Sequence, residues 1–174
     1  DRRDDATLDN KATTGEIAYL VQAHRETGNP AYLAAAGRGV EYLLQAQYAN
    51  GGWPQYYPDR SSYRHQITLN DDAMVRAICL LQDIAEGRDD MAVLTPRYGA
   101  RAVTAAQRGI DSLLAMQVRI DGEPTIWAAQ YDEATLRPAK ARAYELPSLA
   151  VAESVGVLRL LMRQPQPDAR TVAA

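Results

Sequence analysis

Apolar positions along the chain recur every three or four residues in five separate stretches, which is the spacing of amphipathic helices. Polar segments with glycine or proline separate these stretches. No segment alternates apolar and polar residues well enough to predict a sheet, although short strands fit residues 63–69 and 118–131. The pattern therefore predicts an all-α protein, with helices at about residues 13–27, 32–47, 70–87, 97–117 and 148–163.

Local signals mark two of the expected helix starts. Thr13 is followed three residues later by Glu16, which is the arrangement of a capping box. Asn70 stands where its side chain is expected to cap the third helix, with Asp71 and Asp72 in the first turn. Acidic residues in a first turn also complement the helix dipole, which is the simplest explanation for them.

Two of the expected helices resemble each other. RGVEYLLQAQ at residues 38–47 aligns with RGIDSLLAMQ at residues 108–117, and a polar loop with glycine and tryptophan follows each. A helix–loop–helix unit that recurs in this way predicts paired helices around an axis, an α/α toroid. The long loops of such a fold gather at one end, where they can form a cleft.

Composition narrows the class of protein. The chain has 174 residues and a net charge of −3 with scattered basic residues, which argues against a nucleic-acid partner. No run of 18 apolar residues occurs, so no membrane span is expected. The ten tyrosines and two tryptophans, with no phenylalanine, are unusual because several lie in expected loops. The first such loop, NGGWPQYYP at residues 50–58, is therefore a candidate wall of the cleft.

Oxygen-bearing side chains occur at two expected helix starts. Asp9 and Asn10 precede the first helix, and Asp71 and Asp72 open the third. Carboxylate and amide oxygens suit a hard cation such as calcium. No His and Cys arrangement has the spacing of a zinc site, which argues against a transition metal.

The most basic segment is RPAKARAYE at residues 137–145. Solvated surface charge is its simplest explanation. However, the cations are interleaved with tyrosines and acids, which favours a structured place. Aromatic rings that stack on sugars, acids that hold a cation and arginines that pair with carboxylates together fit an anionic sugar polymer.

Four segments closely resemble the pectate lyases of polysaccharide lyase family 10, in the same order and with similar spacing. They are DNKATTGEI, YLLQAQYANGGWPQYYP, ITLNDDAMV and IWAAQYDEATLRPAKARAYELPSLAVAESVG. The resemblance covers nearly the whole chain and implies an α/α toroid. It also implies that residues 1–174 form a single domain from the central section of a longer catalytic domain. By the same resemblance the protein is expected to be a secreted or periplasmic monomer.

The resemblance implies calcium-assisted β-elimination on polygalacturonate, in which a base removes the C5 proton and the O4 glycosidic bond breaks. The base role falls on Arg142, and it requires neighbouring cations such as Lys140 and the calcium to disfavour the charged form. The implied metal ligands are Asp9 and Asp71, with Asp72 as a further candidate. The implied substrate-binding residues are Lys140, Trp53, Tyr56, Asn10, Lys11, Gln130, Tyr131 and Asp132.

Several alternatives remain open. Trp53 is expected either to stack on a sugar or to brace its loop. Tyr131 stands where the family commonly has a histidine, and it cannot titrate near neutral pH. A glycoside hydrolase with a carboxylate pair is the rival enzyme, since α/α toroids carry many functions. A non-catalytic module that binds polygalacturonate is the third hypothesis.

Overall fold

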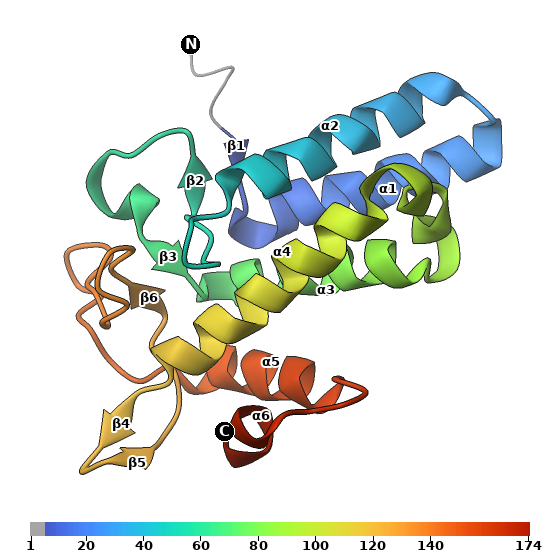
Figure 1. The fold of residues 1–174 in the computed structure, drawn as a ribbon. Coiled ribbons are helices and arrows are strands. Elements are labelled where there is room, and N and C mark those ends of the chain that lie inside the picture. Colours follow the sequence, from blue (N-terminus) through green and yellow to red (C-terminus); the bar gives the residue numbers. More distant parts are fainter. Residues whose placement is uncertain (1–5) are drawn as a thin grey trace.

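The computed structural model describes residues 6–174, and its backbone is mainly helical (Figure 1). Two antiparallel helix pairs, α1–α2 and α3–α4, lie side by side, and α5 and a short α6 follow. The five expected helices are all present, which confirms the predicted all-α fold of paired helices. Within the described part of the chain, no helix has both the length and the apolar character needed to cross a membrane. The helices are α1 Ala12–Thr27, α2 Pro30–Ala46, α3 Ala73–Glu86, α4 Thr95–Met116, α5 Val151–Met162 and α6 Ala169–Ala173.

The two predicted helix caps are wrong in detail. The Thr13 hydroxyl donates to the carbonyl of Thr7 at 2.6 Å, and Thr13 lies inside α1 rather than at its N-cap. The N-cap of α1 is Lys11, whose side chain makes no capping hydrogen bond. Asn70 does not cap α3 either, because Asp72 occupies that position, again without a capping side-chain bond.

A short 3-10 turn precedes α1 and another precedes α3, and the two turns have the same shape. They are η1 Asp9–Lys11 and η3 Asn70–Asp72. The φ angles are 53° and 57° at Asp71 and Asp72, and 48° and 67° at the equivalent positions of η1. Left-handed backbone is uncommon outside glycine, and consecutive strained residues tend to cluster at functional sites. The two turns are therefore candidate parts of a site.

Short antiparallel strand pairs connect these turns to the loops that follow each helix pair. The Leu8 N–H donates to the Gln55 carbonyl at 3.0 Å, and the Leu69 N–H donates to the Ala129 carbonyl at 2.8 Å. The strands expected within residues 63–69 and 118–131 are confirmed. The pairs are β1 Ala6–Thr7 with β2 Tyr56–Tyr57, β3 Ile67–Thr68 with β6 Gln130–Tyr131, and β4 Arg119–Ile120 with β5 Glu123–Pro124.

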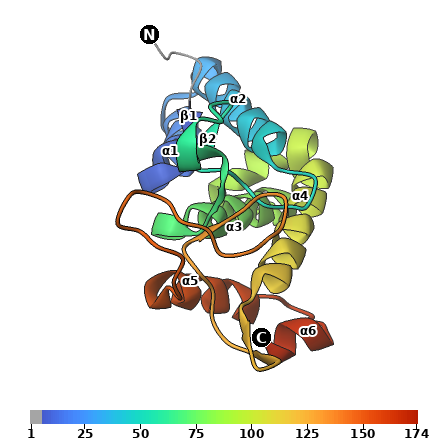
Figure 2. The same cartoon turned by 90° about the vertical axis from the view of Figure 1, so that its left-hand side faces the viewer.

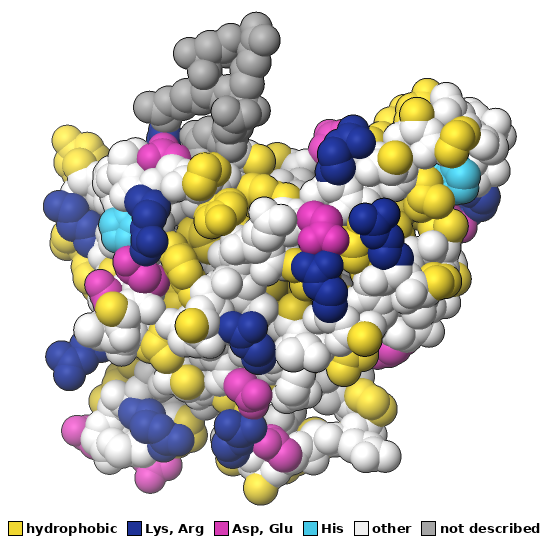
Figure 3. All heavy atoms as spheres, turned by 45° about the horizontal axis from the view of Figure 1, so that its top comes forward, with side chains coloured by type: hydrophobic (Ala, Val, Ile, Leu, Met, Phe, Trp, Pro, Cys, Tyr) yellow, Lys and Arg dark blue, Asp and Glu magenta, His cyan; other side chains and the backbone are white. Residues whose placement is uncertain are grey.

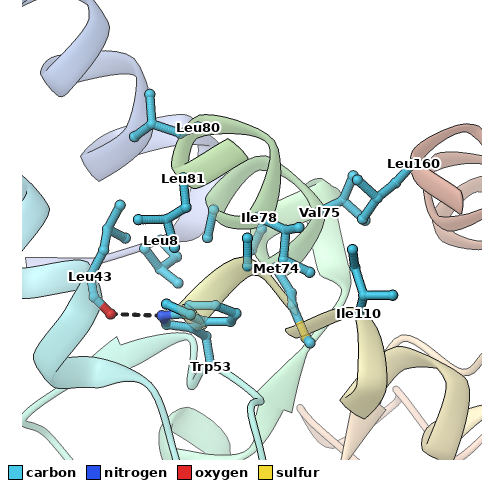
Figure 4. Close-up of a cluster of buried hydrophobic side chains, with 14 of the residues drawn as sticks. Leu8, Leu43, Trp53, Met74, Val75, Ile78, Leu80, Leu81, Ile110 and Leu160 are labelled. Atoms are coloured by element: carbon cyan, nitrogen blue, oxygen red, sulfur yellow. Dashed lines mark hydrogen bonds between the residues drawn. The ribbon is translucent and has the colours of Figure 1, made fainter. Parts of the chain in front are cut away.

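A tryptophan hydrogen bond is repeated in the two halves. Trp53 donates its indole N–H to the Leu43 carbonyl at 2.8 Å (Figure 4), and Trp127 donates to the Leu113 carbonyl at 2.7 Å. Both side chains have no exposed surface. Each acceptor lies in the last turn of the second helix of its pair, where carbonyls have no partner within the helix. The repeated sequence thus encodes a repeated connection between helix end and loop.

The hydrophobic core lies between the helix pairs and extends to α5 (Figure 4). Within each pair an isoleucine packs against a glycine. A Cβ atom at Gly39 would lie 2.5 Å from a carbon of Ile17, and one at Gly109 would lie 2.7 Å from the matching carbon of Ile78. Glycine therefore allows the two helices of each pair to approach closely.

Trp53→Ala is expected to lower the free energy of unfolding by about 3–5 kcal/mol, because it removes a buried ring. Trp53→Phe keeps most of the ring but leaves the Leu43 carbonyl without its donor, which costs about 1–3 kcal/mol. Urea unfolding followed by circular dichroism gives both values, and Trp127→Phe is the matched control with the same expected loss. Unchanged unfolding together with weaker polymer binding would instead show that Trp53 is a stacking platform.

Candidate active site

The candidate site lies at the end of the molecule where η1, η3 and the loop between β6 and α5 come together. Figure 2 looks towards this end, and the β6–α5 loop crosses in front of α3. The two 3-10 turns contact each other, and η3 also contacts α5. The loops therefore gather at one end of the paired helices, which is where the α/α-toroid prediction placed the cleft.

The two turns bring Asp9 and Asp71 together. The η1 and η3 turns contact each other, and the two carboxylates lie close enough to interact. Partial desolvation raises the pKa of Asp71, and the neighbouring Asp9 carboxylate raises it further. Glu153 and Asp72 add to the same effect through their charges. The structure thus creates a local excess of negative charge that a cation would relieve.

A cavity of about 320 Å³ opens beside this acidic pair, and cations share its wall with the acids. Arg76 donates from Nε to the Asp71 carbonyl at 3.2 Å, and its Nη2 lies 3.5 Å from Asp72 Oδ2. Arg76 therefore braces the left-handed turn rather than pointing into open solvent. The cavity is lined by Asn10, Lys11, Asp71, Asp72, Arg76, Ala152 and Glu153.

Asp72 has a different surrounding from Asp71. A Cβ atom at Gly156 of α5 would lie 2.2 Å from Asp72 Oδ1, so only glycine leaves room for this carboxylate. The opposite oxygen faces Arg76. The carboxylate therefore connects η3 to α5, which gives Asp72 a structural role beside the predicted metal role.

The acidic pair supplies only part of the ligand shell that the expected calcium ion needs. Among residues 6–174, no group of three or more His, Cys, Asp or Glu side chains is arranged to hold a metal. Asp9 and Asp71 offer two carboxylates, which are the hard donors that calcium prefers, but calcium takes about six to eight oxygen ligands. The donor chemistry fits, and carbonyls, water or substrate carboxylates would complete the shell.

Arg142 lies in the β6–α5 loop with its side chain 68% exposed. Its Nε donates to Glu145 Oε1 at 2.8 Å, its Nη2 donates to the same oxygen, and its backbone N–H donates to Oε2 at 3.0 Å. These hydrogen bonds, followed by the charge of Glu145, raise the pKa of Arg142. Smaller contributions from Tyr63 and Asp9 act in the same direction, which places Arg142 on the Asp9 side of the molecule. The described neighbours thus favour the charged guanidinium, opposite to the surroundings expected of a base.

A second cavity, of about 370 Å³, lies between β6 and the residues around Arg142. Asn70, Gln130 and Glu145 contribute to its wall. The Gln130 side chain is 3% exposed, and neither of its amide atoms has a hydrogen-bond partner among the described residues. Lys140 is exposed in the same loop.

Two predicted substrate-binding residues are corrected by their burial. Trp53 and Tyr131 have no exposed surface, so neither offers a face to a sugar. The Tyr131 hydroxyl accepts the Ala128 N–H at 2.6 Å, and burial raises the pKa of Tyr131 to about 12. Both side chains are packed in the core, and their hydrogen bonds to backbone groups hold the loops that carry them.

Two further candidates are held by local contacts. The guanidinium of Arg64 lies 4.7 Å from the ring centroid of Tyr56, so one face of this half-buried ring is covered. Asp132 Oδ1 accepts from the Thr135 hydroxyl at 2.8 Å and from its N–H at 2.7 Å, and these bonds lower the pKa of Asp132. The turn bonds make Asp132 a residue that shapes its own loop.

Sequence reasoning missed three charged residues of this end. Glu145 and Arg76 could have been found, because each stands three or four positions from an oppositely charged candidate. Glu153 of α5 has no such signal, since its proximity to Asp71 depends on how α5 packs. On the face in Figure 3, basic and acidic side chains are interspersed and form no broad positive patch.

Comparisons with known proteins agree with this arrangement. The family model for pectic acid lyase matches residues 1–174. A family 10 polysaccharide lyase from Cellvibrio cellulosa is 38% identical with a TM-score of 0.91, covering 96% of this chain and 52% of that chain. A mutant of that lyase in complex with trigalacturonic acid is 37% identical with a TM-score of 0.91, covering 97% and 53%. A comparison with curated proteins found no match.

The paired-helix fold and the sequence both place the chain with the polysaccharide lyases that it resembles. The chain belongs to the pectic acid lyase family. It spans about half the length of the solved lyase structures that it matches.

Asp71→Asn is expected to raise the melting temperature in chelator at pH 7 and to abolish the rise that calcium causes in the original chain. The raised pKa of Asp71 means that its ionisation costs stability as the pH rises through that pKa, and asparagine removes this cost. Thermal unfolding with calcium and with chelator measures both effects. Asp121→Asn, in the β4–β5 turn, is the control with the same charge change. An equal calcium response in Asp71→Asn would refute a shared metal site.

Proposed function

We propose that the protein containing this chain cleaves polygalacturonate by calcium-assisted β-elimination. The observation that carries this proposal is that the η1 and η3 turns, which carry Asp9 and Asp71, contact each other and line one cavity at the loop end of the paired helices. Membership in the pectic acid lyase family supports it, as does the neighbour that holds trigalacturonic acid. An acidic pair next to a basic side chain can bind a cation and an anionic sugar together.

Asp9 and Asp71 would hold the calcium ion, with the Asn10 amide as a further oxygen donor. When bound, calcium supplies positive charge against the C6 carboxylate of a galacturonate and so acidifies its C5 proton. Lys11 lines the same cavity and is placed to contact a carboxylate of the chain. Lys140 is exposed in the loop of Arg142 and is a second candidate for this contact.

Arg142 would act as the base in its neutral form. It takes the C5 proton, the electron pair of the C5–H bond forms the C4–C5 double bond, and the bond from C4 to the glycosidic oxygen breaks. The oxygen then leaves with a proton from water. Glu145 raises the pKa of Arg142, so the neutral form is scarce at neutral pH and turnover should rise towards alkaline pH.

Two other functions predict different products. A glycoside hydrolase would use the Asp9 and Asp71 carboxyls as acid and base, but the family match is to lyases. A non-catalytic module would bind polygalacturonate without changing it. Trp53 and Tyr131, the rings that such a module would use for stacking, are buried. Elimination is therefore the better supported function.

Incubation with polygalacturonate is expected to produce ultraviolet absorbance in the presence of calcium and none in chelator, because elimination leaves a conjugated double bond. The measurement is a continuous absorbance assay, with reducing-end release followed in parallel. New reducing ends without absorbance would indicate a hydrolase. Binding of the polymer without either signal would indicate a non-catalytic module.

Arg142→Ala and Arg142→Lys are both expected to lower kcat by about 10²- to 10⁴-fold, the usual contribution of a general base. Lysine fails because the planar guanidinium sets which nitrogen reaches the C5 proton. Binding of the polymer should survive, so KM changes little. Arg137→Lys, in the same loop, is the control with the same chemical change. A raised KM with unchanged kcat would make Arg142 a carboxylate anchor instead.

A further inference from the structure

Glu145 uses both of its carboxylate oxygens on Arg142. Oε1 accepts from Nε and Nη2 of the guanidinium, and Oε2 accepts the backbone N–H of the same residue. The backbone closes the same turn, because the Glu145 N–H donates to the Arg142 carbonyl at 3.0 Å. The carboxylate and the guanidinium are therefore held in one relative orientation by the turn itself.

This ion pair is a poor candidate for a stabilising contact. The Arg142 and Glu145 side chains are 68% and 36% exposed, and exposed pairs contribute little to folding. Both residues also lie at the candidate site, where Glu145 forms part of the wall of the second cavity. The contact is better explained by its effect on the orientation and protonation of the Arg142 guanidinium.

The bonds to Glu145 distinguish the three guanidinium nitrogens. Nε and Nη2 each donate to the carboxylate, whereas Nη1 has no hydrogen-bond partner among residues 6–174. We propose that Glu145 is a positioning residue that selects Nη1 of Arg142 as the nitrogen that accepts the C5 proton. This inference rests on the proposed function, in which Arg142 is the base.

Which nitrogen accepts the C5 proton depends on which nitrogen of neutral Arg142 has lost its own proton. A neutral guanidine has lost one proton, and the nitrogen that lost it carries the basic lone pair. Loss of either proton from Nη2, or of the proton from Nε, would leave the carboxylate with a weaker donor or none. The proton lost to water therefore comes from Nη1, which then takes the C5 proton while the C5–H electron pair forms the new double bond. The aspartate of a serine protease selects the tautomer of its histidine by the same logic.

The same carboxylate opposes formation of the neutral base. Its hydrogen bonds and negative charge raise the pKa of Arg142, and the other groups that face this side chain, Tyr63 and Asp9, act in the same direction. Glu145 thus decreases the fraction of Arg142 that is neutral, but it fixes the orientation of each neutral Arg142 side chain. Removal of the charge should change these two effects in opposite directions.

Glu145→Gln in the full protein is the first test. The amide keeps the shape and one acceptor oxygen but loses the charge. We expect kcat at alkaline pH to fall by about 10- to 100-fold, the range typical when the partner that orients a metal-bound histidine is lost. The rise of kcat with pH should begin at lower pH, and KM should stay nearly constant. Glu41→Gln, which removes the same charge from the exposed Glu41–Arg101 pair, is the matched control and should leave the profile unchanged.

A second measurement does not depend on activity. Nitrogen-15 NMR of the Arg142 side chain should show slower exchange of the Nε–H proton with water than in Glu145→Gln, because the bond to Glu145 protects it. In the double variant Arg142→Ala with Glu145→Gln, kcat should equal that of Arg142→Ala alone, since Glu145 acts only through Arg142.

The outcomes separate this inference from the proposed function. An unchanged kcat profile in Glu145→Gln, with Arg142→Ala inactive, overturns the role of Glu145 and leaves Arg142 as the base. Equal Nε–H exchange in the two proteins also overturns it. A fully active Arg142→Ala overturns the base assignment, and the role of Glu145 with it, while the absorbance assay still decides whether the protein is a lyase.

Discussion

The hydrogen bond from the Trp53 indole to the Leu43 carbonyl determines where the first long loop begins. Carbonyls in the last turn of a helix have no partner within it, so a buried helix end needs a donor from elsewhere. Once Trp53 supplies that donor, the following residues are fixed, and the Gln55 carbonyl can receive the Leu8 N–H. That bond leads directly into the turn of Asp9. The second half repeats the same sequence of contacts from Trp127 to the turn of Asp71, so the acidic pair depends on two buried indoles.

The helices and the repeat were predictable because both are local in sequence. Apolar spacing defines a helix wherever it packs, and the aligned segments 38–47 and 108–117 predicted the repeat without any knowledge of contacts. The helix starts were not predictable in this way. The Thr13 hydroxyl binds the carbonyl of Thr7, and α1 and α3 each start after two left-handed residues that capping rules do not describe. Such residues cost about 1–3 kcal/mol each, and only the surrounding contacts explain why they persist.

The site was predictable where the family resemblance named residues, and less so where tertiary contacts decide their role. Asp9 and Asp71 were expected to meet, and the structure brings them together. The sequence allows Trp53 to be a platform or a brace, and its burial decides for the brace. The resemblance predicts Tyr131 as a substrate contact, but its strand pairing with β3 and the bond from the Ala128 N–H place it in the core. Glu145 was visible as an acid three residues after Arg142, but its bonds to particular guanidinium nitrogens require the folded turn.

The charge balance of the site bears on how an anionic polymer could bind there. Arg142 is paired with Glu145, Arg76 braces η3 through Asp72, and Asp9 and Asp71 add negative charge. The chain as a whole carries a net charge of −3. Acidic side chains of the protein thus already pair with Arg142 and Arg76. A negatively charged polygalacturonate chain would therefore meet a surface with little unpaired positive charge beside the acidic pair. A bound divalent cation cancels the negative charge of the acidic pair and so removes its repulsion of the polymer. Under the proposed function, calcium is therefore required for recognition of the polymer as well as for acidity of the C5 proton, and both requirements follow from the same two aspartates.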